Sequence, residues 1–232
     1  MSAFFAAAYT DRIEILTDGA TYRDDGTLTD IGSKIFASDE TPLAVTGRGE
    51  TLTVAVFCAA VLAFSCGGFD ACLVRLSAFL AKRQSIGVPG NCEILIAGIS
   101  ETNGPQLWFF ATHNGYPRFE PYMLHNVGPE FGGGNPLTEE EVAGLPSAES
   151  GLAELAVPLF EAMRSKPGFN PAAPHMPAIF GIGGHIDRTV VTADGATTTR
   201  LHTWPDAVGE KIDPMAAPFD DGALFSDGSA FA

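Results

Sequence analysis

The stretch from Leu52 to Phe64 is the longest apolar run in the chain, and no turn signal interrupts it. A transmembrane helix needs roughly 18 to 20 apolar residues. This run is shorter, so we interpret it as a helix buried in the core of a globular protein. We predict a helix over residues 50–66 that lies on a sheet and ends at Gly67-Gly68.

A second helix follows directly along the chain. Asp70 can cap it, and residues 71–83 carry apolar side chains at helical spacing. Lys82 and Arg83 suit the negative end of its dipole. The sequence therefore predicts two consecutive helices, which need a sheet to cover.

Short apolar runs separated by turn signals precede these helices. Ala3–Tyr9 and Arg12–Thr17 predict a strand, a tight turn and a returning strand. Ser33–Phe36 and Leu43–Thr46 are two more strand candidates, and Gly47-Arg48-Gly49 ends the second of them. We expect four strands before any helix.

The rest of the chain alternates strands with helices. We expect a hairpin, an irregular glycine-rich loop, a short acidic helix, a longer helix containing Pro158, and a final hairpin. In the same order, these elements cover Cys92–Ile99 with Gln106–Thr112, Asn126–Pro136, the residues from Thr138 to Glu141, Ser150–Lys166, and Ala178–Val191 with Ala196–Trp204.

The composition favours one domain followed by an acidic tail. The chain has 232 residues, 46% of them hydrophobic, which is enough apolar material for one core. We assign the domain to residues 1–204 and an extended or disordered acidic tail to residues 205–232. The formal net charge of -15 argues against a nucleic acid or an anionic membrane surface as partner.

The N-terminus and the cysteines indicate a cytoplasmic protein. The apolar run that opens the chain has no basic flank and stops at Tyr9, so a signal peptide is not expected. The four cysteines, Cys58, Cys66, Cys72 and Cys92, lie in apolar runs without the close pairing of a zinc or redox motif. We therefore interpret them as reduced core residues.

Three segments near the N-terminus carry a family resemblance. They are the strand that ends in Asp18, the lysine-bearing Ser33-Lys34-Ile35-Phe36, and the glycine turn Val45-Thr46-Gly47-Arg48-Gly49. Together with the order of elements, they resemble the β-type subunits of proteasomes and their bacterial relatives. The resemblance implies an α+β fold, a four-layer αββα sandwich of two antiparallel sheets, as in the N-terminal nucleophile hydrolases.

The resemblance also implies a catalytic set. In that family the mature N-terminal residue is the nucleophile, and an Asp and a Lys follow at successive spacings of 16. Here Asp18 follows Ser2 by 16 positions, and Lys34 follows Asp18 by 16. With one residue deleted between Lys34 and Gly47, Gly47 matches the glycine whose N–H faces the developing oxyanion. The implied activity is hydrolysis of a peptide or amide substrate by a homo-oligomer, without a cofactor.

An N-terminal serine carries its own general base, because a free α-amine has a pKa of roughly 7.7 to 8.0. Lys34 beside Ser2 would stabilise the developing alkoxide, and Asp18 would compensate the charge of Lys34. This chemistry requires removal of Met1, for which a small residue at position 2 is suitable.

Two observations keep a second interpretation open. The family carries an Arg-Asp pair and a nearby Ser after its last long helix, whereas Ser165-Lys166-Pro167 follows Arg164 here. Considered singly, Ser2 is a common second residue, Asp18-Gly19 is a usual turn, and Lys34 is an ordinary strand residue. The alternative function is therefore a non-catalytic structural or assembly protein that retains the fold.

Other chemistries find less support. The histidines lack the pairing with carboxylates that a metal site needs, so we assign no metal to His113, His125, His175, His185 and His202. Gly132-Gly133-Gly134 lacks the Lys and Ser or Thr of a phosphate-binding loop. Ser65, Ser85 and Ser100 do not fit the nucleophile-elbow pattern, which disfavours a Ser-His-Asp triad.

Overall fold

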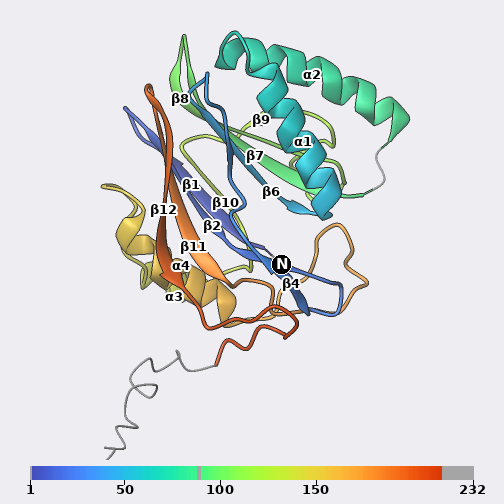
Figure 1. The fold of residues 1–232 in the computed structure, drawn as a ribbon, viewed down its shortest axis with the longest axis vertical. Coiled ribbons are helices and arrows are strands. Elements are labelled where there is room, and N and C mark those ends of the chain that lie inside the picture. The colour runs from blue at the N-terminus through green and yellow to red at the C-terminus, as the bar shows by residue number, and fades with distance from the viewer. Residues whose placement is uncertain (1, 88–89, 216–232) are drawn as a thin grey trace, which may run out of the picture.

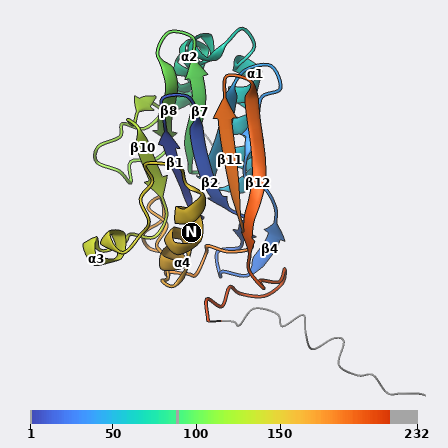
Figure 2. The ribbon, with the colours of Figure 1, turned by 90° about the vertical axis from the view of Figure 1, so that its left-hand side faces the viewer.

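Two antiparallel sheets form the centre of the computed structural model, which describes residues 2–87 and 90–215 (Figures 1 and 2). The first sheet has the order β10-β1-β2-β11-β12 and the second the order β5-β6-β7-β8-β9. The strands of the first sheet are β10 (Glu130–Gly133), β1 (Phe4–Ala8), β2 (Ile13–Asp18), β11 (His185–Thr192) and β12 (Gly195–Thr203). Those of the second are β5 (Phe36–Ala37), β6 (Leu43–Gly49), β7 (Cys92–Ser100), β8 (Gly104–Ala111) and β9 (His125–Asn126).

A small hairpin of β3 (Ala20–Tyr22) and β4 (Leu28–Ile31) lies between β2 and the start of the second sheet along the chain. Together with β5 and β6 it brings the strands before the first helix to six, where four were predicted. The α+β class with antiparallel sheets is confirmed.

Side chains from both sheets fill the space between them. Phe4 and Ala6 of β1 point inward with Ile15, and they meet Leu95 and Phe109 of the second sheet in one buried cluster. Inward residues alternate along β1 because successive strand side chains point to opposite faces. The residues that alternate with them, Ala3, Phe5 and Ala7, belong to a different cluster on the outer face.

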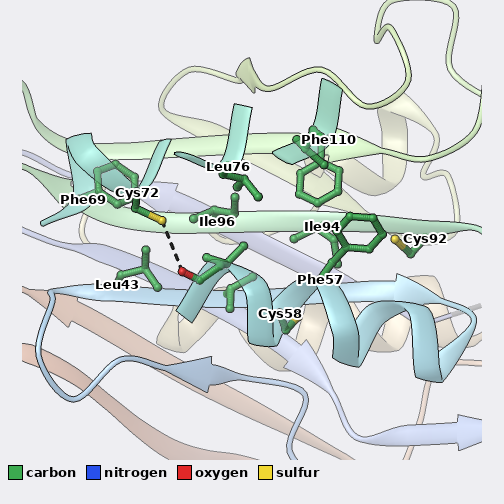
Figure 3. Packing of buried hydrophobic residues seen from close by; sticks show 13 residues of the cluster. Leu43, Phe57, Cys58, Phe69, Cys72, Leu76, Cys92, Ile94, Ile96 and Phe110 are labelled. Atoms are coloured by element: carbon green, nitrogen blue, oxygen red, sulfur yellow. Dashed lines mark hydrogen bonds between the residues drawn. The ribbon is translucent and has the colours of Figure 1, made fainter. Parts of the chain in front are cut away.

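Helices α1 (Thr51–Phe64) and α2 (Phe69–Ile86) cover the outer face of the second sheet. Figure 3 shows their buried side chains, including Phe57 and Leu76, packed over Ile94 and Ile96 of β7. Both predicted helices are confirmed. Asp70 is not the cap of α2: that helix begins after Gly68, and the carboxylate of Glu101 accepts hydrogen bonds from its first two N–H groups.

Helix α4 (Ala153–Arg164) covers the outer face of the first sheet, where Leu159, Phe160 and Met163 pack against Leu16 and Ile186. It begins three residues later than predicted and contains Pro158 in its second turn. The short helix α3 (Glu139–Ala143) precedes it, and the predicted cap Thr138 forms a capping box with Glu141.

Three predicted segments differ from the structure. Within Asn126–Pro136, Glu130–Gly133 is the edge strand β10, not an irregular loop. Its glycines are needed for space, because a Cβ on Gly132 would overlap Phe5 and one on Gly133 would overlap Arg48. Only Phe36 of the predicted strand Ser33–Phe36 lies in a strand, and the final hairpin begins at residue 185 and not at 178.

The first part of the predicted tail packs on the domain. Residues 205–215 have an irregular course, yet Ile212 is buried against Ala20 and Leu28, and the side chain of Asp206 is 3% exposed. The acidic composition of this segment does not predict that packing. The rest of that segment lies outside the described residues.

Candidate active site around Ser2

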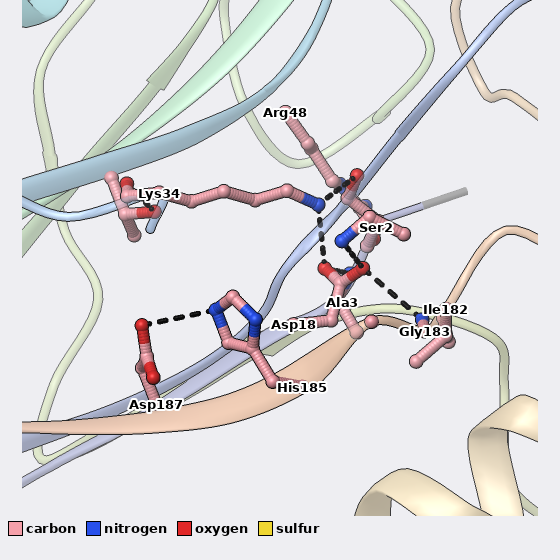
Figure 4. A network of polar contacts seen from close by, with 12 residues as sticks. Ser2, Ala3, Asp18, Lys34, Arg48, Ile182, Gly183, His185 and Asp187 are labelled. Carbon is pink, nitrogen blue, oxygen red and sulfur yellow. Dashed lines mark hydrogen bonds and ion pairs between the residues drawn. The ribbon is translucent and has the colours of Figure 1, made fainter. Parts of the chain in front are cut away.

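The ends of several strands meet at one edge of the two sheets, and Ser2 lies there. It precedes β1, and Asp18 ends β2 beside it, because the two strands are antiparallel and Phe4 faces Thr17. Lys34 approaches from the irregular segment that runs from β4 to β5. Figure 4 shows the three side chains pointing toward one another.

Asp18 is a fully buried carboxylate with four donors. One oxygen accepts hydrogen bonds from the N–H of Ala3 at 2.9 Å and from Lys34 Nζ at 2.9 Å. The other accepts from the N–H of Ala20 at 3.2 Å and of Gly183 at 3.4 Å. A buried charge is tolerated when it is paired and hydrogen-bonded in this way. Asp18 thus ties together three segments of backbone and one cation.

Lys34 links Asp18 to Ser2. Its Nζ donates to Ser2 Oγ at 2.8 Å, in addition to its bond with Asp18, and its side chain is 15% exposed. Burial lowers the pKa of Lys34, while the charge and hydrogen bond of Asp18 oppose this shift. The hydroxyl of Thr46 donates to the Lys34 carbonyl at 2.9 Å, which fixes the irregular segment against β6.

The hydroxyl of Tyr22 adjoins Ser2, a contact that the sequence did not predict. Burial and the nearby charge of Asp18 raise the pKa of Tyr22, and hydrogen bonds from the side chain and backbone of Ser2 oppose the shift. Tyr22 ends the short strand β3. No sequence pattern predicted that strand, so the position of the Tyr22 hydroxyl beside Ser2 could not be predicted either.

Gly47 lies on β6 between Thr46, which is bonded to the Lys34 carbonyl, and Arg48, which is bonded to the Ser2 carbonyl. A Cβ at this position would overlap Ile94 Cδ1 and the Glu93 carbonyl. Close packing on β7 therefore accounts for the glycine. Of the four predicted site residues, the structure brings Ser2, Asp18 and Lys34 into direct contact and places Gly47 on the adjoining strand.

The loop before β11 supports Asp18 from behind. Its Gly183 N–H reaches Asp18, and its Gly184 N–H donates to Asp206 at 2.7 Å. Arg164, at the end of α4, donates to both oxygens of Asp206 at 2.9 and 2.7 Å and to the Ile182 carbonyl at 2.8 Å. The partner of Arg164 therefore comes from the segment after residue 204, where the sequence analysis expected only a tail.

His185 lies next to this loop, and its ring occupies the space that a side chain on Gly19 would need. The Asp18-Gly19 pair is thus a point of close packing as well as a chain junction. His185 Nε2 lies 3.1 Å from Asp187 Oδ2 and 3.1 Å from Arg200 Nη2. Burial lowers the pKa of His185, the charge of Asp187 opposes that shift, and Arg200 adds to it.

Within residues 2–87 and 90–215, no group of three or more His, Cys, Asp or Glu side chains is placed to hold a metal ion. Among the helices in those two segments, none is both long enough and apolar enough to span a bilayer. A comparison of the sequence with known protein families finds no family model that matches, and no curated protein matches it.

Proposed function

We propose that this protein is an amidohydrolase or peptidase that uses Ser2 as an N-terminal nucleophile once Met1 has been removed. The observation that carries the proposal is the position of Lys34 Nζ, 2.8 Å from Ser2 Oγ and 2.9 Å from Asp18 Oδ1. A buried ammonium held on a serine hydroxyl is suited to stabilising an alkoxide.

We propose that the fold is the four-layer αββα sandwich of the proteasome-type hydrolases. Three apolar clusters support this proposal. One lies between the two helices α1 and α2 and the second sheet, one lies between the sheets, and one lies between the first sheet and α4. In such a sandwich the nucleophile would lie where the ends of the inner strands meet.

The proposed reaction is acyl transfer to water. The freed α-amine of Ser2 takes the proton from Oγ, and the oxygen attacks the substrate carbonyl. The charge of Lys34 stabilises the developing alkoxide, and the N–H of Gly47 would donate to the tetrahedral oxyanion. Such a donor contributes about 3 to 4 kcal/mol in comparable sites. The ammonium then returns its proton to the leaving amine, and water hydrolyses the Ser2 ester.

The resemblance implies further properties that we carry into the proposal. A cytoplasmic location fits the four free cysteines, since disulfides are rare in reducing compartments. A homo-oligomer fits the apolar side chains on the outer helices, where Leu52 is 68% and Val74 is 72% exposed. Light scattering on the purified protein tests the second point, and a monomeric mass contradicts it.

A panel of fluorogenic peptide and acyl amides tests the activity on full-length protein whose Met1 has been removed. We expect hydrolysis by the wild type, its loss in Ser2→Ala, and retention in Ser33→Ala, which changes a neighbouring exposed serine. Circular dichroism must show that both variants are folded. If the processed wild type cleaves nothing in the panel and Met1 removal makes no difference, the scaffold alternative replaces the enzyme.

A further inference from the structure

Arg48 contacts the backbone of Ser2 from a buried position on β6. Its Nη1 donates to the Ser2 carbonyl at 3.3 Å, and the residue is 8% exposed. The Ala3 N–H belongs to the same peptide group as that carbonyl, and it is bound by Asp18 at 2.9 Å. Two buried side chains thus hold one planar peptide unit at both of its polar ends.

The other arms of the guanidinium are fixed as well. Nε donates to Glu93 Oε2 at 2.6 Å, and Nη2 donates to the Tyr116 hydroxyl at 2.6 Å. That hydroxyl donates to Glu93 Oε1 at 2.9 Å, and His113 Nε2 lies 3.3 Å from the same oxygen. Arginine suits this place because its planar fork can address three acceptors at once.

The backbone around the guanidinium is adapted to it. Gly133 of β10 lies so close that a Cβ there would be 2.9 Å from Arg48 Cζ. The ring of Phe4, which follows the held peptide, lies with its centroid 5.6 Å from the same atom. The Arg48–Glu93 ion pair is by itself weak evidence of a stabilising role, since apolar residues of similar volume often stabilise a fold equally well. The geometry of the Arg48 contacts is therefore more informative about its role than the presence of the ion pair.

We infer that Arg48 is a positioning residue for Ser2: it fixes the Ser2–Ala3 peptide so that Oγ faces Lys34 and the freed α-amine keeps one direction. This inference rests on the function proposed above. Reacting groups held in a near-attack geometry gain rate, and a displacement of about 1 Å can cost about 100-fold.

A purely structural role is the competing explanation. Arg48 and Glu93 face each other on neighbouring strands, so their pair also joins β6 to β7. Removing it could lower stability without affecting Ser2. The test therefore has to separate the rate of the chemical step from folding and from reagent affinity.

The probe is a β-lactone, whose ring opens on attack by a serine hydroxyl to leave an ester on Oγ. Intact-mass spectrometry at several lactone concentrations gives the maximal acylation rate and the half-saturating concentration, and peptide mapping locates the ester. The variants are Arg48→Lys and Tyr116→Phe, with Ser2→Ala as a blank. Arg188→Lys is the matched control, because Arg188 also pairs with a buried glutamate, Glu14, on a strand of the first sheet.

We expect Arg48→Lys to keep the positive charge and to remain folded at the assay temperature, although lysine cannot reproduce the three contacts of the guanidinium. Its maximal acylation rate should fall about 10- to 100-fold. Tyr116→Phe keeps the Arg48–Glu93 ion pair but removes the acceptor of Arg48 Nη2, so its maximal acylation rate should fall several-fold. Half-saturation should change little in either variant, and Arg188→Lys should react like the wild type.

The outcomes distinguish the two proposals. If the wild type is acylated on Ser2 and both Arg48→Lys and Tyr116→Phe react at the maximal rate of the wild type, the positioning role is overturned and the proposed function stands. If the processed wild type forms no ester on Ser2, the proposed function fails and the inference fails with it. A fall in melting temperature with an unchanged maximal rate assigns Arg48 a structural role only.

Discussion

Replacing Asp18 by asparagine keeps the shape of the side chain and removes its charge. In the wild type the two carboxylate oxygens accept four hydrogen bonds, three from backbone N–H groups and one from Lys34. The amide of asparagine has only one oxygen, so its NH2 group must face two donors. In addition, the ammonium of Lys34 loses its buried counter-charge.

The expected cost follows from these contacts. Breaking a buried ion pair from one side costs about 3 to 5 kcal/mol, and each unsatisfied buried donor costs about 1 to 3 kcal/mol. The terms overlap, so we expect Asp18→Asn to lose about 4 kcal/mol of unfolding free energy. Adding Lys34→Met removes the uncompensated ammonium and should restore about 1 to 3 kcal/mol.

Urea denaturation at neutral pH of the wild type, both single variants and the double variant closes the thermodynamic cycle. A second readout uses pH. Without Asp18, the pKa of Lys34 falls further below its value of 10.5 in the unfolded chain. Between the pKa of Lys34 in the folded variant and 10.5, the unfolded state binds more protons than the folded state. The unfolding free energy of Asp18→Asn should therefore rise with pH in that range. Additivity of the two substitutions within about 0.5 kcal/mol would refute the coupling.

Three further predictions concern pH and packing. Burial alone would raise the pKa of Glu14, but hydrogen bonds from Arg188, Leu152 and Arg12 lower it from 4.5 to about 2. At about 1.4 kcal/mol for each pKa unit, Glu14 contributes about 3 kcal/mol, present above pH 4.5 and lost as pH falls toward 2. Acid titration of stability should therefore bring the wild type and Glu14→Gln together at low pH, and a constant gap contradicts the assignment. Gly19→Ala should lower the melting temperature because its Cβ overlaps the His185 ring, and an unchanged value contradicts that packing. The rate of amide hydrolysis should rise with pH as the Ser2 amine loses its proton at about pH 8. On a further increase in pH the rate should fall again before pH 10.5 is reached, because the lowered pKa of Lys34 lets it deprotonate there. A rate that keeps rising through pH 10.5 contradicts the requirement for a charged Lys34.

The long helices and the longest hairpin could be predicted from the sequence. The helices that follow Gly49 and Gly68 are rich in apolar residues and bounded by glycine, and their side chains fill the outer cluster of the second sheet. The hairpin of β7 and β8 carries its own turn. In these elements local pattern and tertiary packing agree, which is why the prediction succeeded.

Short or glycine-rich elements could not be predicted in this way. The strand of Glu130–Gly133 is defined by its pairing with β1 and not by its own residues. The Lys34 segment is irregular because the chain passes there from the β3-β4 hairpin to the second sheet. The hydrophobic pattern of a segment does not show which distant strand it pairs with.

The candidate site was predicted in part through the family resemblance. The family's spacing of 16 positions singled out Ser2, Asp18 and Lys34, and the side chain of Lys34 contacts the other two. Arg48 and Asp206 were missed because their partners are distant in sequence. Arg48 reaches Ser2 across 46 positions, and Asp206 reaches Arg164 across 42. A buried cation requires a counter-charge, but the sequence does not say which carboxylate supplies it.

The most direct test of the central claim is the intact mass of the purified protein, before and after exposure to a β-lactone. We predict that Met1 is absent and that one ester forms, mapped to Ser2, in the wild type. The ester should form far more slowly in Lys34→Met, which keeps the hydroxyl but lacks the ammonium 2.8 Å from it. Retention of Met1 on a chain that still hydrolyses amides, or acylation at another residue, would contradict the account.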